Sequence, residues 1–146
     1  MNSPHTSTTQ NICRIGLGLF MLLAGIGHLT FKRKEFQAQV PDWVPLNEDL
    51  VVIVSGVAEV ALGGAMVFLP KHKVKTGIAL AAFYVAVFPG NISQYLNGID
   101  AFGLDTDQKR FARLFFQPVL IVWALWSTGV FQWMHQNRKK SRSLLS

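Results

Sequence analysis

The chain has 146 residues, of which 50% are hydrophobic and only 15% are charged, and its formal net charge is +6. The charged share is well below the roughly 25% of an average soluble domain, and the charges fall between long uncharged segments. This pattern is typical of one multi-pass membrane domain rather than of a large soluble core. The basic residues lie at the ends of apolar segments without a basic and aromatic groove, which argues against nucleic-acid binding. Cys13 is the only cysteine, so an internal disulfide and a CxxC redox site are excluded.

The N-terminal part of the chain is predicted to be a tail followed by a first membrane span. Residues 1–11 are rich in Ser, Thr and Asn and lack apolar periodicity, so we expect them to be disordered. The first span is predicted over 12–31. Helical spacing puts His28 on the packed face of this span, together with Gly18, Met21 and Gly25. A single histidine there is either a hydrogen-bonded packing residue or a ligand.

The segment 32–49 mixes seven charged residues with aromatic and aliphatic ones. It is predicted to be a short amphipathic segment at the membrane interface, with Trp43 at headgroup level and turns at Pro41 and Pro45. The alternative is that the segment covers the helix bundle as a lid.

The second span is predicted over 50–69 and carries Glu59 near its centre. A carboxyl group at that depth costs about 2.5 to 3.5 kcal/mol on insertion scales. Glu59 is therefore expected to face other helices and to find partners there. Gly56 and Gly63 lie on the same face and allow a neighbouring backbone to come close.

The third span is predicted over 76–96, and the short basic connection before it makes it antiparallel to the second. Pro89 removes a backbone donor, so the helix is expected to kink or partly unwind there. Asn91 and Gln94 follow this position at membrane depth.

The fourth span is predicted over 111–134, after a polar loop. Arg113 and Gln117 share one face of it. Arg113 either extends outward to the membrane surface or reaches inward towards Glu59. The basic residues 135–146 are predicted to be an unfolded tail.

Four spans place both termini on one side of the membrane. That side has eight Lys and Arg residues and the other has six, which predicts cytoplasmic termini. The polar side chains within the spans then all fall in the outer leaflet, and they are His28, Glu59, Asn91, Gln94, Arg113 and Gln117. They form either a ligand pocket or a structural network that fixes how the helices dock. No predicted helix carries two histidines at the spacing of metal ligands, which argues against a metal site.

Five motifs follow one another along residues 12–126: AGIGHLTF, FQAQVPDWVP, SGVAEVALGGAMVFLP, YVAVFPGNISQYLNG and RLFFQPVLIVWAL. In this order they resemble the DoxX-like family of small four-helix bacterial membrane proteins. The positions that match are His28, Pro41, Pro45, Gly56, Glu59, Pro89, Asn91 and Gln117. The resemblance implies a four-helix bundle in the bacterial inner membrane. It also implies a redox link, because the family name comes from a subunit associated with thiosulfate:quinone oxidoreductase.

We therefore expect an all-α fold, an integral membrane four-helix bundle with short loops. No motif identifies a reaction, so the sequence leaves open whether the protein is an enzyme. The first hypothesis is a quinone-linked subunit with no intrinsic cofactor, in which Glu59 carries protons while His28 and Gln117 position a bound quinone. Its partners would be membrane lipids and a redox subunit or a second copy of the chain. The alternative is a non-enzymatic scaffold or a small-molecule or lipid-binding protein. A transporter is disfavoured because no inverted repeat is evident.

Overall fold

The computed structural model describes residues 3–144, and all regular structure within this range is helical. Six α-helices are present where the sequence predicted four. In chain order they are α1 (Thr8–Leu29), α2 (Arg33–Gln37), α3 (Glu48–Phe68), α4 (Lys73–Leu96), α5 (Asp107–Ser127) and α6 (Val130–Ser143), with a short 3₁₀ helix, η1 (Pro70–His72), before α4.

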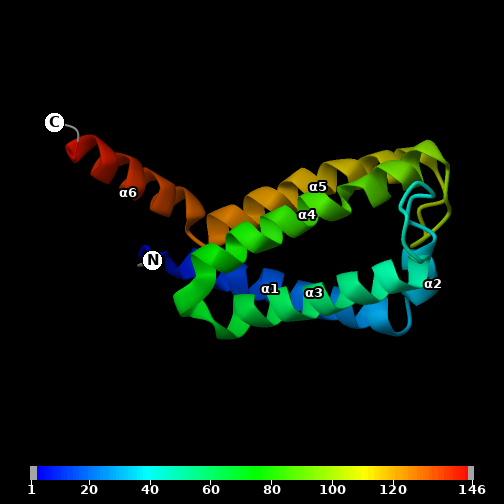
Figure 1. The fold of residues 1–146 in the computed structure, drawn as a ribbon, viewed down its shortest axis with the longest axis horizontal. Coiled ribbons are helices and arrows are strands. Elements are labelled where there is room, and N and C mark those ends of the chain that lie inside the picture. Colours follow the sequence, from blue (N-terminus) through cyan, green and yellow to red (C-terminus); the bar gives the residue numbers. More distant parts are fainter. Residues whose placement is uncertain (1–2, 145–146) are drawn as a thin grey trace.

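The four long helices form two pairs (Figure 1). Helix α1 packs along α3, and α4 packs along α5. The short helix α2 and the loop between α4 and α5 lie together at one end of the molecule. The start of α1 lies at the other end, where α6 leaves the pairs and projects away from them.

Glycines bring α1 and α3 into close contact. A Cβ atom on Gly18 would lie 2.9 Å from the carbonyl oxygen of Gly63, and one on Gly63 would lie 2.7 Å from the carbonyl oxygen of Gly18. Nearer the α2 end, a Cβ atom on Gly25 would lie 2.8 Å from the carbonyl oxygen of Gly56. The two backbones therefore touch along the helix pair, as small residues allow in membrane helices.

A buried apolar cluster joins the two pairs. It takes residues from all four long helices: Leu17, Met21, Met66, Leu80, Tyr84, Leu120 and Ala124. Within it the Tyr84 hydroxyl donates to Met21 Sδ over 2.9 Å. The faces predicted to pack, including Gly56, Glu59, Gly63 and Met66 on α3, are buried in the structure.

The outward faces of the long helices remain apolar. Large exposed side chains include Leu23 of α1, Val54 of α3, Val85 of α4 and Phe115 of α5, each about 60% or more exposed. Three helical segments are long and apolar enough to cross a membrane: Thr8–Leu29, Glu48–Phe68 and Pro70–Leu96. A fourth is present if α5 and α6, bent by 58°, are taken as one broken span.

Helix α1 starts earlier than predicted. Ser7 caps it, accepting from the Gln10 backbone N–H while its own N–H donates to the Gln10 side chain, so the helix begins at Thr8 within the expected tail 1–11. Thr6 is buried and accepts from Lys73 Nζ over 2.7 Å. The described part of the predicted tail is thus packed rather than disordered, and residues 1–2 lie outside the described range.

The predicted fourth span, 111–134, is wrong as one straight helix. Helix α5 ends at Ser127, and Gly129 has a left-handed backbone with φ +78°. Thr128 is fully buried and donates to the Ala124 carbonyl oxygen over 2.6 Å. This turn redirects the chain into α6, so the tail 135–146 is helical as far as Ser143, and residues 145–146 lie outside the described range.

Pro89 does not unwind α4, so the unwinding expected as one of two outcomes is wrong. The helix is continuous from Lys73 to Leu96. One missing N–H removes only one backbone hydrogen bond. The flanking turns are held by tertiary contacts, since Tyr84 is buried and Asn91 bonds to Gln117 on α5.

We predict that Gly63→Ala destabilises the protein and that Gly64→Ala does not. The new methyl group at position 63 would collide with the backbone of α1, whereas nothing lies within 4 Å of one at position 64. Overpacking of this kind costs about 1 to 3 kcal/mol. Thermal unfolding of both variants in detergent measures the difference, and equal melting temperatures would contradict the close packing of α1 and α3.

Candidate functional site

A cavity of about 200 Å³ lies between the two helix pairs, near the end covered by α2. All four long helices contribute to it. Its polar lining consists of His28, Gln39, Glu59, Tyr84, Asn91, Arg113 and Gln117. Apolar side chains such as Met21, Phe36 and Phe102 fill the rest of the wall.

One short polar contact in the cavity joins α1 to α3. His28 Nδ1 lies 2.7 Å from Glu59 Oε2, and each side chain is about 10% exposed. The same Nδ1 atom is 3.1 Å from the Ala24 carbonyl oxygen. The hydrogen bond of this nitrogen is the one with Ala24, and the buried Glu59 Oε2 forms no hydrogen bond with any described residue.

Helix α2 covers this pair. The ring of Phe36 stacks on His28 with centroids 3.2 Å apart, and Phe102 packs edge-on against Phe36 at 4.6 Å. The loop holding Phe102 is fastened to α2, because the Phe102 N–H donates to Glu35 Oε2 over 2.6 Å. Of the two alternatives for the segment 32–49, α2 therefore adopts the second, in which the segment covers the helix bundle.

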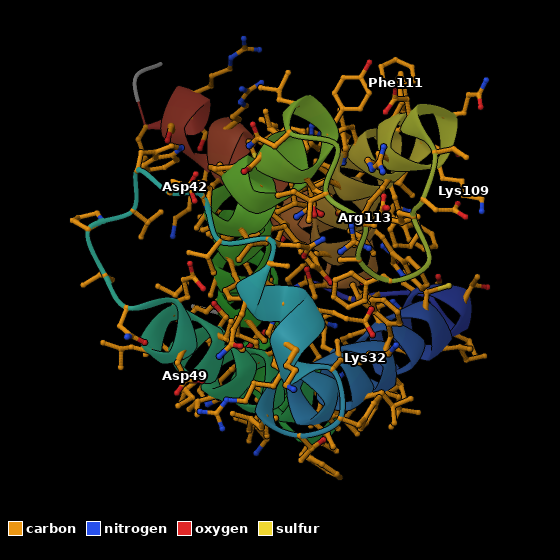
Figure 2. The ribbon with its side chains drawn as sticks, turned by 90° about the vertical axis from the view of Figure 1, so that its right-hand side faces the viewer. Lys32, Asp42, Asp49, Lys109, Phe111 and Arg113 are labelled. Atoms are coloured by element: carbon orange, nitrogen blue, oxygen red, sulfur yellow. The ribbon has the colours of Figure 1, made fainter. Side chains whose placement is uncertain are left out.

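Arg113 turns inward and joins a chain of hydrogen bonds. Its Nε donates to Asn91 Oδ1 over 3.1 Å, and Asn91 Nδ2 donates to Gln117 Oε1 over 3.0 Å. Gln117 Nε2 donates in turn to the Tyr84 carbonyl oxygen over 2.7 Å. Figure 2 shows Arg113 near the middle of this end of the molecule, whereas Lys109 and Phe111 lie at its rim. The guanidinium also lies over the Phe102 ring, 5.3 Å from its centroid.

The sixth candidate, Gln94, lies outside the cavity. Its side chain is only 1% exposed and donates to the carbonyl oxygens of Ile99 and Ala101 over 3.3 and 3.2 Å. Its Oε1 accepts from the Gln39 side chain. Gln94 therefore anchors the loop after α4 to the segment after α2.

An apolar groove of about 390 Å³ adjoins the polar cavity. It runs between α3 and α4 beneath residues 39–46, and its walls include Val51, Val54 and Ala86. His28, Phe36, Gln39 and Val87 line both spaces. A molecule with a polar end and an apolar end would thus find both surfaces side by side.

The sequence predicts five of the cavity's polar residues, and it offers a lid formed by 32–49 as one of two alternatives. It does not single out Gln39 or Phe102. Gln39 and Phe102 lie outside the long helices, so no helical periodicity marks them. Among residues 3–144, no three His, Cys, Asp or Glu side chains group as a metal ion would require.

These features define an all-helical protein with polar residues of four helices around one covered cavity. The model of the family described as Domain of unknown function (DUF8561) matches residues 17–128, and the chain belongs to this family. The match spans the cavity and its cover. No curated protein and no solved structure matches the chain. The resemblance of the five motifs to DoxX-like proteins stays a prediction.

We predict that the cover is fastened less firmly at acid pH. The hydrogen bond from Lys32 lowers the pKa of the Glu35 carboxyl, and the Phe102 N–H adds to this effect. The charged carboxylate is thus favoured in the folded state. Its contribution is complete above the ordinary carboxyl pKa and is lost as the pH falls through the lowered value. Protection of the Phe102 amide from hydrogen exchange, corrected for the intrinsic rate, should fall over that range.

The matched variants are Glu35→Gln and Asp105→Asn. Both remove a carboxylate that pairs with a lysine at 2.6 Å, but Asp105 does not bond to Phe102. Glu35→Gln should reduce the protection at neutral pH and abolish its pH dependence, since a neutral acceptor is weaker. An unchanged profile in Glu35→Gln, or the same loss in Asp105→Asn, would show that Glu35 does not hold the cover.

Proposed function

We propose that this protein is a four-span protein of the bacterial inner membrane that binds a small amphipathic molecule in the cavity around Glu59. The apolar outward faces of the long helices support membrane insertion, because such faces are unfavourable in water. In this arrangement α5 and the first turn of α6 form the fourth, bent span, and the basic C-terminal turns of α6 lie outside the hydrocarbon. The excess of Lys and Arg at the end with both termini supports placing that end in the cytoplasm.

The observation that carries the proposal is the His28–Glu59 contact inside a cavity covered by aromatic rings. The two side chains lie 2.7 Å apart, and the buried Glu59 Oε2 has no hydrogen-bond partner among the described residues, so this carboxyl is available to bond to a bound molecule and to exchange a proton with it. Gln117 and Asn91 add amide groups to the same wall. Such a site suits a ring with carbonyl oxygens, because the ring can pack on Phe36 or Phe102 while its oxygens accept hydrogen bonds.

A quinone has this chemistry and takes up two protons when it receives two electrons. In the proposed role, Glu59 carries protons and His28 and Gln117 position the headgroup. The electrons would come from a redox partner subunit. The apolar groove between α3 and α4 would hold the tail, because it shares four lining residues with the polar cavity.

The hydrogen-bond chain from Arg113 to Tyr84 favours a second candidate, a non-enzymatic scaffold. Asn91 and Gln117 bond to each other and to further partners on α4 and α5. A network satisfied in this way fixes how two helices dock without any ligand. Under this alternative the cavity residues affect stability alone.

We predict that wild-type protein purified in detergent retains a quinone and that Glu59→Gln loses it. Mass spectrometry of the lipid extract measures the bound molecule. Glu48→Gln is the matched control, since Glu48 is exposed in the first turn of the same helix and lies outside both cavities. It should retain the quinone.

Thermal unfolding of the same samples separates the two candidate functions. Loss of the quinone from a Glu59→Gln variant that still unfolds cooperatively near the wild-type temperature would favour the ligand site. No specific molecule in any sample, together with a Glu59→Gln variant destabilised by about 1 to 3 kcal/mol, would favour the scaffold.

We further predict that Ala86→Phe lowers retention of the ligand while Ala82→Phe does not. Both alanines are exposed on α4 one turn apart, but only Ala86 lines the apolar groove. A phenyl ring at position 86 would occupy the space proposed for the tail and leave the Glu59 cavity intact. Equal retention in both variants would remove the groove from the binding site.

A further inference from the structure

The end of the molecule opposite the cavity is basic and has no acidic counterpart. The eight acidic residues of the chain are Glu35, Asp42, Glu48, Asp49, Glu59, Asp100, Asp105 and Asp107. Glu59 lies within α3, and the other seven lie in the helix starts and loops at the α2 end. From residue 108 to the C-terminus the sequence has no Asp or Glu. Positive charge at the other end is therefore not neutralised within the chain.

Two of the basic residues at this end already have internal partners. Arg14 is buried and donates to the Met66 carbonyl oxygen, and Lys73 donates to Thr6. Six others are exposed and form no ion pair with any described residue: Lys71, Lys75, Arg138, Lys139, Lys140 and Arg142. Four of these six lie on α6.

Helix α6 changes character along its length. Its first turns carry Phe131, Trp133 and Met134, and its last turns carry the four basic residues. The helix leaves α5 at an angle of 58°, so it does not continue along the span. Aromatic residues followed by Lys and Arg are typical of a segment that passes from hydrocarbon to the headgroup layer.

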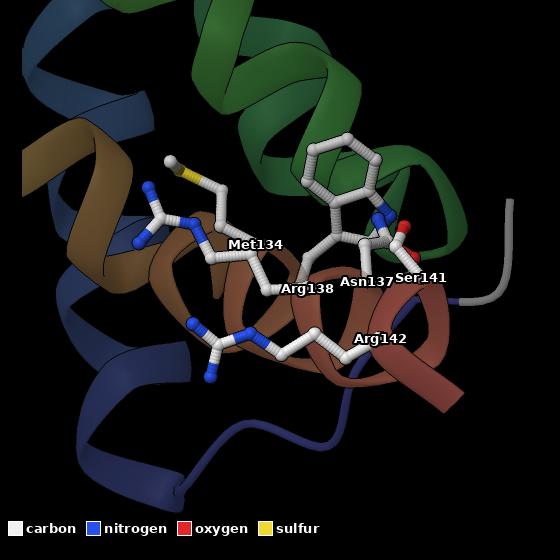
Figure 3. A pocket seen from close by; sticks show the side chains of 6 residues that line it. Met134, Asn137, Arg138, Ser141 and Arg142 are labelled. Carbon is white, nitrogen blue, oxygen red and sulfur yellow. The ribbon is translucent and has the colours of Figure 1, made fainter. Parts of the chain in front are cut away.

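An open surface depression of about 520 Å³ lies between the side chains of α6, and both its basic and its apolar residues line it. Figure 3 shows Arg138 and Arg142 one turn apart and projecting in the same direction, with Met134 beside Arg138. Guanidinium groups bind phosphate oxygens through paired hydrogen bonds. An apolar side chain beside them suits the start of an acyl chain. The depression is lined by Trp133, Met134, Asn137, Arg138, Ser141 and Arg142.

We propose that α6 is a membrane-surface helix that binds anionic phospholipid headgroups through Arg138, Lys139, Lys140 and Arg142. The exposed Lys71 and Lys75, at the same end of the molecule, extend the basic surface. Clusters of four to eight Lys and Arg next to a span are the usual signature of anionic lipid recognition, and each residue adds to the attraction. The inference rests on the proposed membrane insertion but is independent of the ligand at Glu59.

The test uses the full chain in nanodiscs of phosphatidylcholine alone or of an equimolar mixture with phosphatidylglycerol. Hydrogen exchange of the backbone amides of α6 is the measurement, and the amides of α3 are the internal reference. We expect exchange in α6 to be about tenfold slower or more in the anionic nanodiscs, and high salt should remove the difference.

Two quadruple variants separate charge from helix stability. Replacing Arg138, Lys139, Lys140 and Arg142 by Gln should abolish the lipid-dependent difference. Exchanging Arg for Lys and Lys for Arg at the same positions should keep most of it, because the charge is unchanged.

Failure of this inference is distinct from failure of membrane insertion. A chain that does not enter nanodiscs, or whose α3 amides exchange freely there, would overturn the insertion on which the inference rests. The role of α6 would be overturned if the chain inserts but its α6 amides exchange at equal rates in both kinds of nanodisc. It would also be overturned if the variant without the four charges keeps the lipid-dependent difference. If α6 binds an acidic protein instead of lipid, its amides should also exchange at equal rates in the neutral and the anionic nanodiscs.

Discussion

The close approach of α1 and α3 is the constraint on which the rest of the structure depends. Gly56 has no side chain at the point where His28 crosses it, and a Cβ atom there would lie 2.8 Å from His28 Cβ. Because this space is free, His28 reaches Glu59 one turn further along α3. The same glycines that allow the backbones to touch therefore determine the contact at the centre of the cavity.

A buried carboxyl also needs surroundings that tolerate it. Around Glu59 the structure combines an imidazole at 2.7 Å with a nearby guanidinium and amides on the facing helix pair. Phe36 and Phe102, which come from segments outside the long helices, cover the pair on one side. In such surroundings electrostatic interactions are stronger than in water, so the contact between His28 and Glu59 is stronger than it would be at the surface.

The two ends of the molecule differ in chemistry as well as in shape. The α2 end holds paired charges that fasten loops to one another, such as Arg33 with Asp49 and Arg110 with Asp100. The opposite end holds basic residues on α6 and around η1 that form no ion pair with any residue of the described range 3–144. A protein that sits across a bilayer meets different surfaces on its two sides, and this asymmetry suits a covered site on one side and lipid headgroups on the other.

The sequence by itself determined the helical class and the packed faces, because apolar and small residues recur at helical spacing over about twenty residues in each long segment. It also singled out Glu59, since an ionisable residue within an apolar segment needs partners on other helices. Only the tertiary structure decided which partners these are. His28, Asn91, Arg113 and Gln117 meet Glu59 around one cavity, whereas Gln94 bonds into a loop instead.

The cover and the bend were likewise decided by tertiary contacts. The bond from the Phe102 N–H to Glu35 joins the loop of Phe102 to the helix of Phe36, and no periodic pattern encodes this contact. The break after Ser127 depends on Thr128 packing against Gly77 and on a left-handed Gly129, so local apolar character alone predicted a longer straight span. Periodic patterns reveal what each helix buries, and contacts between segments distant in the chain decide where polar side chains converge.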